Sequence, residues 1–235
     1  MTFLHGSSSS RRRACARGSK RSQVTNVILG VSSLLIAGEC VIDAPVYNPL
    51  AIFAEIDLFD KWMPQVDHIA LVGRLSKFRR IIHYRFKMPI FFSNRDYVCS
   101  VVGNIDKEHK AVVFTMKSIE TPEYLGFKIP QPGKAVRVDM KLGALGFEYI
   151  NDTQCRFRIV LQIDPKIKMI PFSVINFGTK LIIFEFLKIL THMSENYDDV
   201  YKQRIKQNTL QIYSEARKRI EDVIGHPLHI PYLDD

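Results

Sequence analysis

Apolar and polar residues alternate over much of the chain between residues 34 and 163, and this period of two is typical of half-buried β-strands. The clearest case is residues 79–88, where Ile82 and Tyr84 share one face and Arg85 and Lys87 the other. The pattern predicts strands at residues 34–42, 79–88, 97–102, 111–116, 136–142 and 155–163. A short helix is predicted between the first two strands.

After Asp164-Pro165 the period becomes that of a helix. The apolar stretch from Pro171 to about Asn196 carries a polar stripe at helical spacing, formed by Lys180, Glu185, Lys188 and His192. This stripe indicates a long amphipathic helix and not a membrane span. A second helix is predicted from about Asp198 to Ile224. A run of strands followed by a helix that covers them indicates an α+β fold, in which a curved antiparallel sheet grips the long helix.

The composition is that of a globular protein, since 46% of the 235 residues are hydrophobic and 24% are charged. The net charge of +9 is concentrated near the N-terminus, where no acidic residue precedes Glu39 and six basic residues occur: Arg11, Arg12, Arg13, Arg17, Lys20 and Arg21. Without these six, 27 basic residues face 24 acidic ones, so the charge does not predict nucleic-acid binding. We interpret residues 1–23 as a disordered basic leader, either an organelle transit peptide or an artefactual leader.

Sequence signals for chemistry are sparse. Four widely separated cysteines, Cys15, Cys40, Cys99 and Cys155, show neither zinc-site nor disulfide-framework spacing. No nucleophile elbow, H-E-x-x-H motif or phosphate loop occurs. We therefore expect no catalytic residues, no cofactor and no metal site.

Five landmarks occur in order along the chain: Ile42-Asp43-Ala44-Pro45; Trp62-Met63-Pro64; Pro89 with Ser93-Asn94-Arg95-Asp96-Tyr97-Val98; Asp164-Pro165; and Ile170-Pro171 with Asn176-Phe177. Over about residues 34–197 the chain therefore resembles the START (steroidogenic-acute-regulatory-related lipid-transfer) domain, a helix-grip fold. The resemblance implies an internal apolar cavity that binds one lipid. It divides the chain into a START-like domain at residues 24–197, an additional helix at 198–225 and a tail at 226–235.

The chain departs from the family pattern at three places. START domains begin with a helix and two strands that the region before residue 34 does not match, so the sheet is incomplete or the chain is a truncated product. Val101 stands where the family often has an arginine that meets a polar lipid head, and Ile82 where a carboxylate partner occurs. Because a buried charge is costly without its partner, the double loss implies a sterol, fatty acid, diacylglycerol or ceramide-like ligand more than a choline phospholipid.

The resemblance and the strand parity together assign three sets of residues. The cavity wall is expected to comprise Ile82, Tyr84, Phe86, Cys99, Val101, Met116, Val138, Met140, Phe157, Ile159, Phe177, Leu181 and Phe184. The loop at residues 121–134, with the start of the long helix, is expected to be a gate that uses Tyr124, Leu125, Gly126, Phe127 and Ile129, unless these residues pack permanently on the sheet. An anionic membrane is expected to meet Arg74, Lys77, Arg79, Arg80, Arg85 and Lys87, unless this is merely a solvated strand face.

These inferences predict a monomeric lipid-transfer protein that binds no nucleic acid and contacts membranes transiently. We expect it in the cytoplasm, or in mitochondria or another organelle if the leader is a transit peptide. The alternatives are a non-catalytic interaction or membrane-docking module with a filled core, and a helix-grip hydrolase or cyclase. Cavity size separates these interpretations, because a cavity well below about 300 Å³ counts against lipid transfer.

Overall fold

The computed structural model describes residues 28–30, 33–88, 92–166 and 172–234. Its main sheet has nine strands in the order β1-β2-β11-β10-β6-β5-β4-β3, with β9 parallel to β5. The strands are β1 (Ile28–Gly30), β2 (Ser33–Ile42), β3 (Val66–Ser76), β4 (Arg79–Phe86), β5 (Arg95–Asp106), β6 (Ala111–Ser118), β9 (Val136–Arg137), β10 (Asp139–Asn151) and β11 (Gln154–Asp164). A separate hairpin consists of β7 (Glu123–Tyr124) and β8 (Phe127–Lys128).

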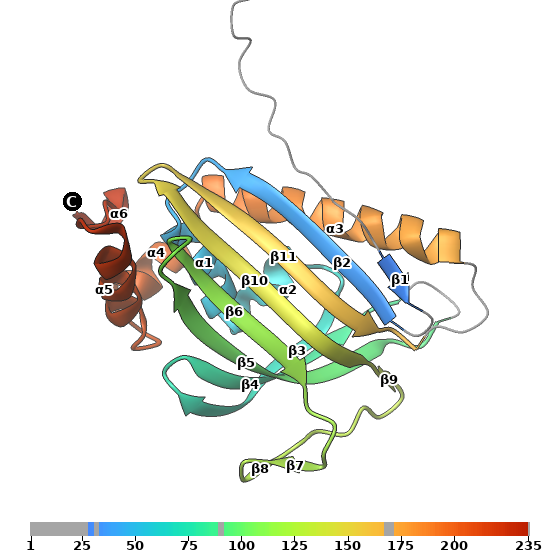
Figure 1. Cartoon of the computed structure of the whole chain (residues 1–235). Helices are drawn as coiled ribbons and strands as arrows, with labels where there is room; N and C mark the ends of the chain where they lie inside the picture. Colours follow the sequence, from blue (N-terminus) through green and yellow to red (C-terminus); the bar gives the residue numbers. More distant parts are fainter. Residues whose placement is uncertain (1–27, 31–32, 89–91, 167–171, 235) are drawn as a thin grey trace, which may run out of the picture.

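The helices lie on one side and at one end of this sheet (Figure 1). They are α1 (Tyr47–Ala54), the short 3-10 helix η1 (Ile56–Leu58), α2 (Phe59–Trp62), α3 (Phe172–Glu195), α4 (Asp199–Lys206), α5 (Tyr213–Ile224) and α6 (Pro231–Asp234). The sheet curves around α3, which runs along β2 and β11, while α4, α5 and α6 gather at the end of the sheet (Figure 1). The predicted α+β helix-grip fold is therefore confirmed.

Helix α3 approaches the sheet closely at Gly38 of β2. A Cβ atom at this position would lie 3.1 Å from Cγ2 of Ile183 and 3.3 Å from Cδ1 of Leu187. The missing side chain thus lets the apolar stripe of α3 sit directly on the backbone of β2. On that stripe Leu187 and Leu190 are fully buried.

An aromatic cluster fills the core between α1, α3 and the sheet. The ring centroid of Phe53 lies 5.4 Å from that of Phe147, 5.8 Å from Phe157 and 6.2 Å from Phe186. Phe147 and Phe157 are fully buried. Since truncating a buried phenylalanine to alanine typically costs about 3–5 kcal/mol, this cluster is a main source of stability.

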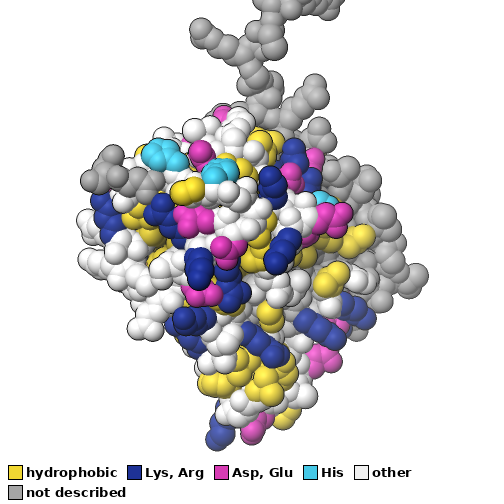
Figure 2. Space-filling model, turned by 60° about the vertical axis from the view of Figure 1, so that its left-hand side comes forward, with side chains coloured by type: hydrophobic (Ala, Val, Ile, Leu, Met, Phe, Trp, Pro, Cys, Tyr) yellow, Lys and Arg dark blue, Asp and Glu magenta, His cyan; other side chains and the backbone are white. Residues whose placement is uncertain are grey.

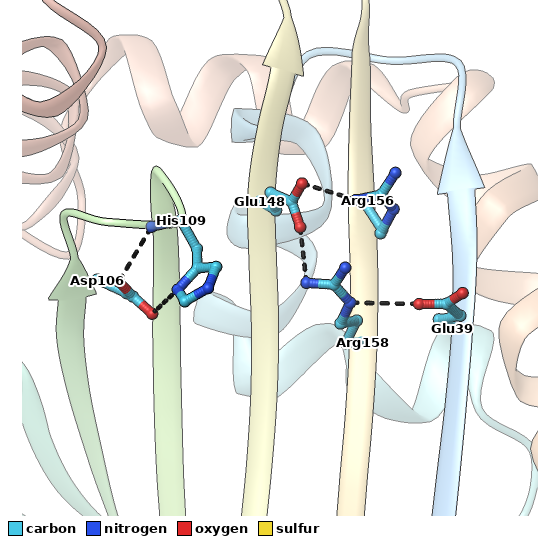
Figure 3. Close-up of polar contacts among 6 residues, drawn as sticks. All are labelled: Glu39, Asp106, His109, Glu148, Arg156 and Arg158. Atoms are coloured by element: carbon cyan, nitrogen blue, oxygen red, sulfur yellow. Dashed lines mark hydrogen bonds and ion pairs between the residues drawn. The ribbon is translucent and has the colours of Figure 1, made fainter. Parts of the chain in front are cut away.

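The opposite, outer face of β2, β11 and β10 is polar and carries a ladder of ion pairs (Figure 3). Glu148 accepts from Arg156 and from Arg158 at 2.7 Å each, and Arg158 reaches Glu39 at 3.2 Å. In the β5–β6 turn, Asp106 accepts from the backbone N–H of His109 at 3.1 Å. Such exposed pairs contribute little to stability, but they show that this face is solvated and that the core lies on the other side.

Three parts of the sequence prediction need correction or lie outside the described residues. Strand β3, at Val66–Ser76, was not predicted. The predicted single helix from Asp198 to Ile224 is two helices, because Asn208 adopts a left-handed conformation and its side chain accepts from the backbone N–H of Tyr213 at 3.0 Å. The basic leader at residues 1–23 lies outside the described residues.

The residues predicted as a tail, 226–235, are instead packed in the described portion up to residue 233. Leu228 and Ile230 are fully buried. The hydroxyl of Tyr232 donates to Oδ1 of Asn48 at 2.9 Å. The C-terminal segment is therefore an integral layer of the fold, and none of the described helices is long and apolar enough to cross a membrane.

Candidate functional site: an apolar pocket beside the C-terminal helices

A pocket of about 100 Å³ lies between the concave face of the sheet, helix α1 and helix α5. The sheet contributes alternate residues of β4, β5, β6 and β10, because side chains on one face recur at every second position. The pocket is lined by Tyr47, Leu50, Ala51, Phe53, Ala54, Lys77, Phe78, Arg80, Ile82, Tyr84, Val101, Gly103, Asn104, Ile105, Val112, Phe114, Met116, Leu145, Ile212, Tyr213, Ala216 and Arg219. The lining is predominantly apolar, and its charged residues are all basic.

The structure brings a minority of the predicted wall residues together in this pocket. Ile82, Tyr84, Val101 and Met116 line it. The others from the sheet do not line it: Phe86 is half-buried, while Cys99, Val138, Met140, Phe157 and Ile159 are buried elsewhere in the protein. For Phe157 the reason is direct, because its ring packs among those of the aromatic core.

The prediction that three residues of α3 belong to the cavity wall is wrong. Phe177, Leu181 and Phe184 are 72%, 52% and 45% exposed. The buried stripe of α3 runs through Ile183 and Leu187, and at 100° per residue the three predicted positions fall on the opposite side of the helix. They form an exposed apolar surface on α3 together with Val174 and Ile182.

Arg80 was predicted to meet a membrane, but it is buried in the pocket with only 9% of its surface exposed. On β4 it has the same parity as Ile82, so its side chain enters the concave side. Its Nη1 donates to the carbonyl oxygen of Ala54, at the end of α1, at 2.8 Å. Its Nη2 is buried and has no hydrogen-bond partner among the described residues. Burial lowers the pKa of Arg80 below its usual value, yet arginine remains charged at neutral pH.

The remaining predicted docking residues do not form one free basic patch. Arg79, on the opposite face from Arg80, donates to the hydroxyl of Tyr124 at 2.7 Å. Arg85 is half-buried, whereas Arg74, Lys77 and Lys87 are exposed. The end of the molecule that carries the C-terminal helices shows basic and acidic side chains interspersed (Figure 2).

The loop predicted as a gate lies on the outer face of the sheet, away from the pocket. Ile129 is 6% exposed and packs in a small second core with Ile81 and Val98. The ring of Phe127 covers Gly73, where a Cβ atom would come within 2.5 Å of it. Gly126 and the exposed Leu125 form the turn with positive φ angles. In this structure the loop therefore packs on the sheet, which is the alternative to a gate given in the sequence analysis.

Within the Ser93–Val98 motif, Asp96 serves the outer face. Asp96 is fully buried, and its carboxylate accepts from Nε of Arg137 and pairs with Nε2 of His83. Arg137 in turn donates to the carbonyl oxygen of Pro130 in the loop. Arg95 donates from Nε to the carbonyl oxygen of Pro165 at 2.7 Å. These contacts hold the strand and the loop, and none of Asp96, Arg137, His83 and Arg95 lines the pocket.

An ion pair between the buried Glu55 and the partly exposed Arg204 anchors the C-terminal helices over the pocket. Glu55, 1% exposed at the end of α1, accepts from Nη1 of Arg204 on α4 at 2.6 Å and from the hydroxyl of Tyr213 on α5. Arg204 also reaches Asp57 at 2.8 Å. The hydroxyl of Tyr47 donates to the backbone oxygen of Tyr213. The helix that forms one wall of the pocket is thereby tied to α1.

Sequence reasoning missed the part of the pocket made by α1, Phe114 and α5. Phe114 could have been found, because it alternates with Met116 in a predicted strand. Ile212, which precedes α5, and Ala216 on α5 also line the pocket, and nothing local in the sequence indicates which surface these apolar residues cover.

No protein-family model and no curated protein sequence matches this chain. Solved structures do resemble it. Human STARD10 superposes with a TM-score of 0.64 at 16% identity, covering 83% of this chain and 80% of that one. Human StAR-related lipid transfer protein 5 gives 0.60 at 14% identity, with 75% and 87% covered. A STAR-related lipid transfer protein from Xanthomonas axonopodis gives 0.52 at 16% identity, with 73% and 97% covered.

Proposed function

We propose that this chain, which has the START-domain fold, binds one lipid in the pocket beside its C-terminal helices and carries it between membranes. The observation that carries the proposal is the apolar lining on the concave face of this fold, where Ile82, Tyr84 and Met116 converge. The proposed role is non-catalytic. Among the described residues no aspartate, glutamate, histidine, serine or cysteine lines the pocket.

The energetics of transfer define what such a protein has to do. Each buried CH₂ group is worth about 0.8 kcal/mol against water, so a 16-carbon chain exposed to water costs roughly 12 kcal/mol. In a bilayer the chain is already buried, and its movement into an apolar pocket is nearly neutral in free energy. The protein therefore acts kinetically, by offering a path that avoids water.

The pocket must widen to hold a long-chain lipid. Its volume of about 100 Å³ is well below the roughly 300–1,000 Å³ of ordinary ligand pockets. The closed pocket therefore counts against lipid transfer by the size criterion given above, and the proposal requires the pocket to open. Because α5 forms one wall, we propose that displacement of α4–α6 admits the ligand, in place of movement of the loop at residues 121–134. A sterol, fatty acid, diacylglycerol or ceramide-like ligand remains the predicted class.

We propose that membrane contact uses the exposed apolar surface of α3. Phe177 at 72% and Leu181 at 52% exposure lie one turn apart, and Lys180 between them is exposed as well. An apolar surface flanked by basic residues favours the interface of an anionic bilayer. Of the predicted basic residues, Arg74, Lys77 and Lys87 are exposed and available to add electrostatic attraction.

A second candidate function is a non-catalytic interaction module with a filled core. The small volume of the pocket is the specific observation that favours it. Under this alternative the exposed surface of α3 binds a protein and the pocket stays closed.

Native mass spectrometry of the purified full chain, followed by a lipid-transfer assay between liposomes, separates the two functions. A co-purified lipid, or transfer above the spontaneous rate, supports lipid transfer and identifies the ligand class. The absence of both would overturn lipid transfer and favour the interaction module.

A further inference from the structure

Resting on the proposed function, we infer that Arg80 anchors the head of the ligand and that the pocket selects an acidic amphiphile, namely a free fatty acid bound as its carboxylate. This inference replaces the uniformly apolar wall expected from Ile82 and Val101. It restores one positive charge to the concave face, at a position directly opposite Val101 in the β4–β5 ladder.

Within the described part of the chain, Arg80 carries an unsatisfied hydrogen-bond donor. Arg80 is 91% buried, since only 9% of its surface is exposed, and it lines the pocket. Its Nη1 donates to the carbonyl oxygen of Ala54, whereas its Nη2 has no acceptor among the described residues. Buried polar atoms are nearly always hydrogen-bonded, and an unpaired buried charged donor is expensive. An oxygen of a bound ligand would satisfy it.

The sign of the charge around the pocket also favours an anion. Among the described residues that line it, Lys77, Arg80 and Arg219 are charged, and none is acidic. The buried carboxylate of Glu55 interacts electrostatically with Arg80, but it is already paired with Arg204 and Tyr213. A single anion therefore finds attraction without a competing acid in the lining.

The free donor and the direction of strand β4 both bear on the ligand. Nη2 is a single free nitrogen, so it can bind one oxygen of a carboxylate in a charge-assisted hydrogen bond, whereas a phosphate, with three oxygens, needs more donors. Lys77 and Phe78 precede Arg80 at the strand end, and Ile82 and Tyr84 follow it on the same face. A carboxylate at Arg80 thus leaves its chain pointing along Ile82 and Tyr84 into the apolar part of the pocket.

The test compares two ligands of equal chain length, decanoate and 1-decanol, by isothermal titration calorimetry with the full chain below their aggregation concentrations. Wild-type protein is expected to bind decanoate at least about tenfold more tightly, the usual effect of a hydrogen bond to a charged group. Arg80→Met should abolish this preference while keeping or improving decanol binding. Arg79→Met is the matched control, because Arg79 lies on the opposite face, and it should leave both affinities unchanged.

The outcomes separate this inference from the proposed function. Equal binding of the two ligands by wild-type protein, or an unchanged preference in Arg80→Met, would overturn the role of Arg80 and leave lipid binding intact. Binding of neither ligand, together with no co-purified lipid, would overturn both. If Arg80→Met does not fold, the preference of the wild type decides, supported by Arg80→Lys, which keeps the charge and should keep a preference for decanoate.

Discussion

The ion pair of Glu55 and Arg204 offers the sharpest test of how the C-terminal helices are held. Glu55 is 1% exposed and the Arg204 side chain 27%, and Arg204→Met would remove the cationic partner of Glu55 at 2.6 Å. Leaving one member of a buried pair without its partner costs about 3–5 kcal/mol. The hydroxyls of Tyr213 and Thr209 still face Glu55, so we expect the lower end, a loss of about 3 kcal/mol in the free energy of unfolding.

Urea denaturation followed by circular dichroism and by the fluorescence of Trp62, the only tryptophan, measures this loss. The double variant Glu55→Gln with Arg204→Met should lose less than the sum of the single losses, because no unpaired charge remains. Arg158→Met is the matched control, since Arg158 also binds two carboxylates but is 47% exposed, and it should cost at most about 1 kcal/mol. A change below about 0.5 kcal/mol in Arg204→Met, or strictly additive losses, would refute the reasoning.

Three further predictions follow from packing and burial. Gly73→Ala places a Cβ atom within 2.5 Å of the Phe127 ring, so it should lower the free energy of unfolding by about 1–3 kcal/mol. Adding Phe127→Leu should restore part of this loss. A Gly73→Ala variant with unchanged stability would indicate that the loop is mobile. The double variant Phe177→Ser with Leu181→Ser should reduce sedimentation with anionic liposomes without lowering the melting temperature. The control Leu125→Ser, which changes an exposed apolar residue on the outer loop, should leave both sedimentation and melting temperature unchanged. Equal sedimentation of the wild type and both variants would contradict docking by α3. Burial raises the pKa of Cys40 to about 11 and that of Cys99 to about 12, so the thiolate fraction at pH 8 is about one in a thousand or less. Neither cysteine should react with maleimide until urea is added, which peptide mapping can verify. Rapid labelling of the folded protein would disprove their burial.

The alternation along strand β4 contained more information about the pocket than the predicted list of wall residues took from it. Arg80 and Ile82 have the same parity, so the alternation already placed Arg80 on the concave face. Arg80 was instead grouped with Arg79 because both are basic, although neighbouring residues on a strand point to opposite sides of the sheet. The same alternation correctly placed Ile82, Tyr84, Val101 and Met116 on one surface.

The sequence by itself determined the α+β class, most of the strands and the long helix, since the periods of two and 3.6 are local properties of the backbone. Only the tertiary structure decided where the pocket lies, because its walls come from segments far apart in the chain, such as those of Tyr47 and Tyr213, which are separated by 166 positions. The polar stripe of α3 already indicated its exposed side, because Lys188 and His192 fall there at 100° per residue, as do Phe177 and Leu181. The tertiary structure decided what the opposite side covers, namely the backbone of β2 at the close approach to Gly38.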